Sequence, residues 1–174
     1  MNEVHAGDLD SIIQRALTSF ARESLAGDWR GRREREAVSL FAFGYLLRDV
    51  RAEGILYDPA QITIEFPVPQ VTGRDAGAAS PKSQVCKDLV IWSRPGMTCW
   101  DDAGKPTVPP AAILEWKFGV PTMHEPDVEW LEAFTARFPE TTGYAVVANR
   151  PGGAFLLECV RVTRGVAERE WLQA

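Results

Sequence analysis

The sequence predicts an α/β fold in which a mixed central β-sheet is flanked by helices. Two observations favour this class. Apolar residues recur at helical spacing in the first third of the chain, and apolar runs of strand length dominate afterwards, with one helical segment between them. Three strands followed by a helix and a further strand are typical of a mixed sheet with a helical crossover. With 174 residues, the chain is long enough for a real core, so residues 1–174 are expected to form a single domain.

Two helices are expected before the first strand. Residues 8–25 carry apolar side chains at helical spacing, and Gly27 follows them as a stop signal. We interpret this helix as a packing element without chemistry. A second helix is expected from about Arg33 to Glu53, and it ends near Gly54.

Three strands are expected next. Apolar and polar side chains alternate within residues 57–70, and prolines close this run. A polar loop rich in Gly, Ala and Pro follows at 72–83. Residues 86–93 and 111–118 are apolar runs of strand length, and the stretch between them, 94–110, is rich in Pro and Gly and is therefore expected to be a loop.

A helix and two strands complete the pattern. Residues 125–138 have helical spacing, and Pro126 suits the first turn of that helix. A buried strand is expected at 143–149 and a final strand at 154–163. The tail at 167–172 is expected to be a short helix.

Composition and charge narrow the functional classes. The formal net charge is −5, whereas a free-standing nucleic-acid binder is usually basic, so a simple DNA-coating role is disfavoured. The three cysteines are far apart and form no CxxC pair, which indicates reduced thiols. No signal-peptide core and no apolar run near the ~18 residues of a membrane span is present, so a cytoplasmic location without a membrane partner is expected. The absence of a P-loop, a GxSxG elbow and zinc-ligand spacing disfavours an ATPase, a serine hydrolase and a zinc enzyme.

The main candidate site combines the second and third predicted strands. Asp88 lies in the second, and Glu115-Trp116-Lys117 lies in the third. Because side chains alternate along a strand, Glu115 and Lys117 share one face while Trp116 points to the other. Buried charges are costly without partners, and Asp88 on a neighbouring strand is the obvious one. Two carboxylates and a lysine that converge in this way predict a divalent-metal site with a cation beside it.

This pattern resembles the PD-(D/E)xK nuclease superfamily, whose fold is also called restriction-endonuclease-like. The family signature is an acid in the second core strand and (D/E)-x-K in the third, and Asp88 and Glu115-Trp116-Lys117 match these positions. Lys87 stands where the family often has a proline. The resemblance covers roughly residues 33–150 and implies an αβββαβ core, to which this chain adds an N-terminal helix and a C-terminal strand.

The resemblance implies a nuclease that uses Mg²⁺ or Mn²⁺ to hydrolyse phosphodiester bonds, in DNA rather than RNA. Asp88 and Glu115 would be metal ligands together with the backbone carbonyl of Trp116, because Mg²⁺ prefers oxygen ligands. Lys117 would orient the attacking water or stabilise the developing negative charge. The expected partner is nucleic acid, with a homodimer or a partner protein supplying specificity, in a defence, mobile-element or repair context.

A further acid is expected from the second helix. Many members of the superfamily carry a carboxylate in the first core helix, and Glu34 and Glu36 are the candidates. At about 100° per residue, Glu36 aligns with Leu40 and Phe43, which are apolar and are expected to face the sheet. We therefore predict that Glu36 is the inward catalytic or metal-binding carboxylate. A first-turn glutamate favoured by the helix dipole is the alternative.

Substrate contacts are expected from an arginine cluster and one tryptophan. The cluster comprises Arg30, Arg32, Arg33 and Arg35, and it is interpreted either as a phosphate-contacting patch or as the solvated start of a helix. Trp100 lies in the predicted loop beside two aspartates, where an exposed ring could stack on a base.

Three alternatives to a nuclease remain open at this point. The Asp88, Glu115 and Lys117 set could form a buried structural salt-bridge network. The domain could be a non-catalytic nuclease-fold scaffold or the binding subunit of a larger complex. It could also be an unrelated mixed α/β protein in which the ExK match is accidental.

Overall fold

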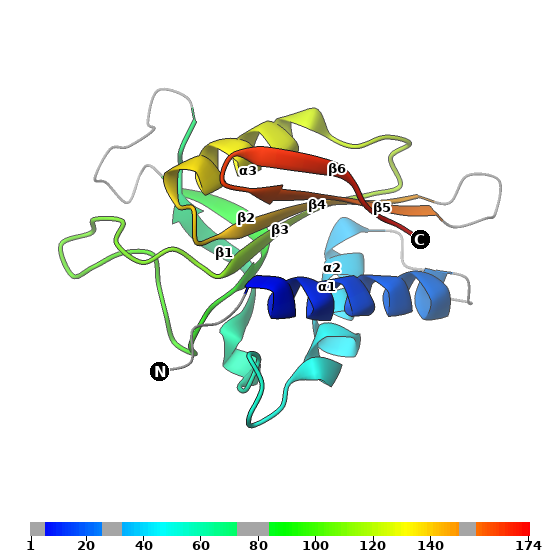
Figure 1. The fold of residues 1–174 in the computed structure, drawn as a ribbon, viewed down its shortest axis with the longest axis horizontal. Coiled ribbons are helices and arrows are strands. Elements are labelled where there is room, and N and C mark those ends of the chain that lie inside the picture. Colours follow the sequence, from blue (N-terminus) through cyan, green and yellow to red (C-terminus); the bar gives the residue numbers. More distant parts are fainter. Residues whose placement is uncertain (1–5, 26–32, 73–83, 150–155) are drawn as a thin grey trace.

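The computed structural model describes residues 6–25, 33–72, 84–149 and 156–174, and these residues form an α/β fold (Figure 1). Its α-helices are α1 (Ala6–Phe20), α2 (Glu34–Gly44) and α3 (Glu125–Arg137). Its strands are β1 (Ile62–Pro69), β2 (Gln84–Ile91), β3 (Ala112–Phe118), β4 (Thr142–Asn149), β5 (Leu156–Thr163) and β6 (Val166–Gln173). The predicted α/β class with a mixed, helix-flanked sheet is confirmed. None of the helices in the described residues is long and apolar enough to cross a membrane.

The described strands form one mixed sheet in the order β1-β2-β3-β4-β5-β6. Neighbouring strands are antiparallel except for β3 and β4, which run parallel. A parallel pair needs a crossover connection, and α3 supplies it across one face of the sheet (Figure 1). The crossover brings the first turn of α3 close to the end of β3, where Asp127 lies 3.4 Å from Lys117.

Helices cover both faces of the sheet. α1 and α2 pack on one face, and α3 packs on the other (Figure 1). On the α1–α2 face, the ring of Trp116 in β3 contacts the rings of Phe20 and Phe41, with centroid distances of 5.6 and 5.1 Å. Because Trp116 alternates with Glu115 and Lys117, its burial in this core directs both charged side chains to the opposite face.

Asp10 ties α1 to the far strands of the sheet. Its carboxylate accepts hydrogen bonds from the Tyr144 hydroxyl and the Arg161 guanidinium. Arg161 also pairs with Glu168 of β6 at 2.7 Å. Burial raises the Tyr144 pKa well above its ordinary value, and the Asp10 carboxylate adds to this shift, so the phenol stays protonated and donates.

The two helices predicted before the first strand differ in how well their predicted ends match the structure. The helix expected over 8–25 forms α1 up to Phe20 and continues as a π-helical turn, Ala21–Leu25. The helix expected from Arg33 to Glu53 is shorter, because α2 ends at Gly44 and a 3₁₀ turn follows. The loop predicted at 72–83 lies, beyond Thr72, outside the described residues.

The last element is a strand and not the helix predicted at 167–172. Arg164 and Gly165 both have positive φ, 52° and 79°, as the two central residues of a type I′ hairpin turn do. The turn places β6 beside β5, and antiparallel pairing starts at Thr163↔Val166. Ladder hydrogen bonds with β5 outweigh the helix preference of this short segment, which would be marginal as an isolated helix.

Candidate functional site

Asp88 lies where β2 and β3 separate. In the described residues, the ladder between these strands ends at Leu89↔Leu114. Asp88 is the residue beyond this last pair, and its side chain replaces a backbone contact of the ladder. Its Oδ2 accepts a 2.8 Å hydrogen bond from the backbone N–H of Trp116. The carboxylate thus takes the place of a strand carbonyl, and β3 itself holds it in position.

The carboxyl group of Asp88 lies close enough to that of Glu115 to raise the Glu115 pKa. Glu115 is buried, with 7% of its surface exposed. Burial raises the pKa of Glu115 to about 7; the ammonium of Lys87 lowers it, and the Asp88 carboxyl raises it again. The structure therefore brings the two predicted acids together, in a place where a second negative charge is unfavourable near neutral pH.

Lys87 provides the internal counter-ion of Glu115. Its ammonium forms a salt bridge with Glu115 Oε1, and its side chain is only 5% exposed. The same ammonium lies 3.5 Å from the ring centroid of Trp130 in α3. The sequence pattern marked Lys87 only as a departure from the family proline. A lysine within an apolar strand, next to an acid, is the signal that indicates a buried partner.

Lys117 is surrounded by oxygen atoms from three elements. Its ammonium donates a 2.8 Å hydrogen bond to the carbonyl of Trp116. It also lies 3.4 Å from Asp127 Oδ2 and 3.7 Å from Glu34 Oε2. Burial lowers the pKa of Lys117, but the nearby carboxylates, that of Asp127 first, raise it by more. Lys117 is therefore a cation at neutral pH.

Asp127 links the site to the first turn of α3. Its carboxylate contacts Lys117 and also His124 Nδ1, at 3.0 Å. The sequence pattern did not identify Asp127, because acids are common in a first helical turn for their interaction with the helix dipole. The signal that could have found it is its position, in the first turn of the crossover helix that follows the ExK strand.

Glu34, and not Glu36, faces the site. The carboxylate of Glu34 contacts Lys117, whereas Glu36 is exposed, so the orientation predicted for Glu36 is wrong. That prediction assumed that Leu40 and Phe43 face the sheet, but Phe43 is 53% exposed. The buried residues of α2 are Ala37, Val38, Phe41 and Ala42. Glu34 lies one helical turn before this stripe and therefore on its side of the helix.

An open pocket of about 300 Å³ gives access to Asp88. It is lined by Arg33, Glu34, Arg35, Val38, Ile64, Glu65 and Asp88. The lining thus combines carboxylates that attract a cation with guanidinium groups that suit a phosphate.

The predicted arginine cluster is described only in part. Arg33 and Arg35 are exposed and line this pocket, and Arg35 pairs with Glu65 at 2.5 Å. Arg30 and Arg32 lie outside the described residues. The phosphate-contacting role of the cluster stays a prediction.

Trp100 is half-buried. It forms an isolated β-bridge with Pro106 of the same loop. Its side chain packs against the apolar core between the sheet and α3. Only part of its ring is open to a base, and the stacking role also stays a prediction.

The site offers carboxylate and carbonyl oxygen atoms, which are the type of ligand that a hard divalent cation prefers. The candidate ligands are the carboxylates of Asp88 and Glu115 and the carbonyl of Trp116. Within the described residues, no group of three or more His, Cys, Asp and Glu side chains is placed to hold a metal ion. Mg²⁺ keeps several waters and is usually bound through one or two carboxylates, so this smaller set fits it. The lysines, however, already occupy two of these ligands, because Lys87 pairs with Glu115 and Lys117 binds the Trp116 carbonyl.

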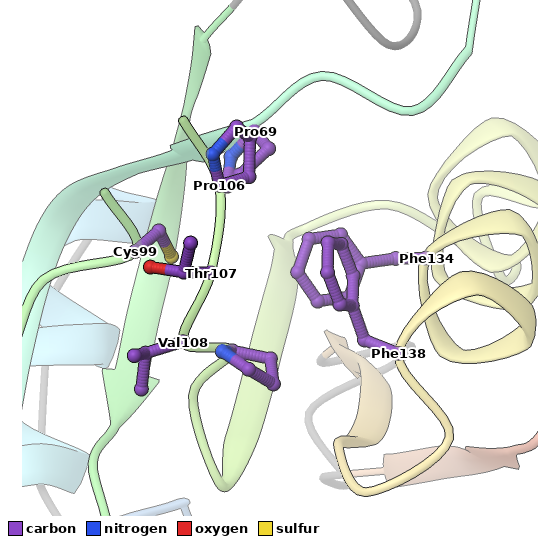
Figure 2. Close-up of a pocket in the computed structure, with 8 residues that line it drawn as sticks. Pro69, Cys99, Pro106, Thr107, Val108, Phe134 and Phe138 are labelled. Atoms are coloured by element: carbon purple, nitrogen blue, oxygen red, sulfur yellow. The ribbon is translucent and has the colours of Figure 1, made fainter. Parts of the chain in front are cut away.

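A second recess carries no such chemistry. Figure 2 shows Phe134 and Phe138, at the end of α3, facing Cys99 and Pro106 of the loop before β3. The lining is largely apolar, and the recess leaves no space that a water molecule could enter. Burial raises the pKa of Cys99 to about 12, so its thiol stays protonated. We interpret this recess as core packing.

Neither protein-family models, nor curated proteins, nor solved structures gave a match to this chain.

Proposed function

We propose that this protein is a metal-dependent nuclease of the PD-(D/E)xK superfamily. The observation that carries the proposal is the position of Asp88 at the point where β2 and β3 separate: its carboxylate binds the Trp116 N–H of the strand that carries Glu115 and Lys117. The order α2, β1, β2, β3, α3, β4 also follows the element order that the resemblance implies. DNA is the proposed substrate, with RNA as the less favoured polymer.

The roles in this proposal follow from charge and position. Asp88 and Glu115 hold the metal, with the Trp116 carbonyl as a further oxygen ligand. When bound, Mg²⁺ or Mn²⁺ polarises the scissile phosphate and lowers the pKa of a coordinated water. Lys117 stays protonated and stabilises negative charge that develops on the phosphate oxygens. Asp127 and Glu34 position the Lys117 ammonium.

The rim of the pocket supplies the substrate contacts. Arg33 and Arg35 stand beside the acidic residues, where their guanidinium groups would contact the nucleic-acid backbone. These two arginines would give an acidic protein, of net charge −5, a local point of contact with a polyanion.

A second candidate function is a non-catalytic nuclease-fold subunit. The observation that favours it is the internal neutralisation of the site. Lys87 is buried against Glu115, and Lys117 is held by Asp127 and Glu34. In such a protein the charged residues would be a structural network and would need no metal.

The experiment that separates the two is a cleavage assay on supercoiled plasmid, linear duplex and single-stranded DNA and on RNA, with Mg²⁺, Mn²⁺ or EDTA. The thermal stability of the protein is measured with and without each metal. Wild type is compared with Asp88→Ala, Lys117→Ala and the exposed control Lys105→Ala. Metal-dependent cleavage that is lost in the first two variants and kept in the control supports the nuclease. Folded wild type that neither cleaves RNA or DNA nor is stabilised by metal contradicts it and favours the non-catalytic subunit.

A further inference from the structure

We propose that Lys87 is a built-in competitor of the metal: its ammonium occupies Glu115 in the metal-free protein, and a divalent cation binds there by displacing it. This inference rests on the proposed function, because it concerns the same two acids. It assigns to Lys87 the regulation of how tightly the site holds its metal.

The first support is the burial of the ion pair. The side chains of Lys87 and Glu115 are 5% and 8% exposed, and the ammonium contacts Oε1 directly. A carboxylate held so closely by one cation cannot accept a second cation without repulsion between the two, since water does not reach the pair to screen them. Metal binding and the Lys87–Glu115 contact therefore oppose each other.

The second support is an alternative partner for the displaced ammonium. Lys87 Nζ lies 3.5 Å from the ring centroid of Trp130, and the face of an indole ring attracts a cation. The ring itself is held, because Trp130 Nε1 donates a 2.6 Å hydrogen bond to Gln70 Oε1. Lys87 can thus move away from Glu115 while it retains an electrostatic partner.

Lys117 differs from Lys87 in its exposure and in its acidic partners. Its side chain is 27% exposed, and its acidic partners are Glu34 and Asp127 rather than Glu115. Lys117 also donates to a proposed metal ligand, the Trp116 carbonyl, but Glu34 and Asp127 would keep its ammonium beside the site once a metal takes that carbonyl. The two lysines of the site have separate tasks.

The direct test is the Mn²⁺ affinity of the full-length protein, measured by calorimetry slightly above neutral pH, where Glu115 is ionised. Lys87→Met is compared with wild type and with Lys105→Met, which removes the same charge at an exposed position. Removal of a competitor should tighten Mn²⁺ binding about fivefold or more in Lys87→Met, within the usual range of coupling between two binding events. Lys105→Met should bind as wild type does. Equal or weaker binding by folded Lys87→Met overturns the inference.

A second measurement needs no variant at Lys87, in case its loss unfolds the protein. The ammonium lies over the Trp130 ring, so a shift of the ammonium away from Glu115 on binding of diamagnetic Mg²⁺ should change the emission of Trp130. The change should be present in wild type and absent from Trp130→Phe. An equal Mg²⁺-dependent change in both proteins overturns the inference.

Asp88→Ala separates this inference from the function on which it rests. Mn²⁺ binding by wild type but not by Asp88→Ala supports the metal site, even where the results for Lys87 and Trp130 go against the competitor. If wild type and all variants fail to bind Mn²⁺, the proposed metal site and the competitor both fall.

Discussion

The backbone N–H of Trp116 donates to the carboxylate of Asp88 across the point where two strands part, at 2.8 Å. A side chain here does what a strand carbonyl does elsewhere in the sheet. As a result, Asp88, which lines the open pocket, is attached to the strand that carries Glu115 and Lys117, and the spacing among these residues does not depend on a loop.

The contribution of this hydrogen bond to the free energy of unfolding can be measured by comparing two substitutions of Asp88. Asp88→Asn keeps an oxygen acceptor for the N–H of Trp116, whereas Asp88→Ala leaves that donor without one. Both remove the repulsion between Asp88 and Glu115, so this term cancels in the comparison. Asp88→Ala should unfold more easily than Asp88→Asn, by about 1–2 kcal/mol in urea denaturation. Equal stability of the two variants would show that Trp116 finds another acceptor.

The stability of the metal-free protein should fall as pH rises through the titration of Glu115. Burial raises the pKa of this group from its ordinary value of 4.5 to about 7, so the folded state binds a proton that the unfolded state releases. The contribution is fully present below about pH 4.5 and is lost as pH rises through about 7. A shift of this size corresponds to about 3 kcal/mol.

The suitable reference is a variant that carries Lys87→Met and Glu115→Gln together, because it lacks both charges of the buried pair. Unfolding is measured in EDTA across the pH range for both proteins. The stability of wild type relative to this variant should decrease between the two pH values. A constant difference would mean that Glu115 titrates near its ordinary pKa.

The rate at which acetic anhydride modifies Lys117 should depend on the carboxylates that raise its pKa. The Asp127 carboxylate is the largest of the influences that raise its pKa, followed by that of Glu34. Asp127→Asn should therefore lower this pKa and speed modification of Lys117 by acetic anhydride at mildly alkaline pH, because only the free amine reacts. Glu34→Gln should have a smaller effect.

Glu36→Gln is the matched control for this labelling experiment, because Glu36 is an exposed glutamate two residues after Glu34 on the same helix. Mass spectrometry of the labelled peptide gives the rate at Lys117. An effect of Glu36→Gln as large as that of Glu34→Gln would contradict the orientation of α2.

Asp10 should matter for stability and not for the site. Its carboxylate is the partner of the buried Tyr144 hydroxyl and of Arg161. Asp10→Ala leaves both without that acceptor and should cost about 2 kcal/mol in urea denaturation. The exposed pair of Arg15 and Asp49 gives the contrast, since Arg15→Ala should cost less than about 1 kcal/mol. Similar losses of stability in the two variants would mean that the hydrogen bonds of Asp10 to Tyr144 in β4 and Arg161 in β5 contribute little.

The strands and the faces of β3 could be predicted from the sequence because both depend on local pattern. Alternation alone places Glu115 and Lys117 opposite Trp116, and the structure has them so. The proximity of Asp88 to Glu115 followed from the same logic, since each buried charge needs a partner within reach.

The partners of the two lysines could not be predicted, because they depend on where other elements begin and how they pack. Asp127 reaches Lys117 only because α3 starts directly over the end of β3. The ring of Trp130 meets Lys87 through tertiary packing that no local pattern contains. The tail at 167–172 shows the same limit, because its pairing with β5 decides its conformation.

The two faces of β3 also have a consequence for misfolding. β3 pairs with β4 in a parallel register that runs from Ala112↔Thr142 to Phe118↔Ala148. A slip by one residue would turn Trp116 out of its aromatic core and push Glu115 and Lys117 into it. The free energy gained by burying the Trp116 indole therefore also disfavours the misaligned sheet. In the folded protein, Glu115 and Lys117 are consequently held in the register that places them at the site.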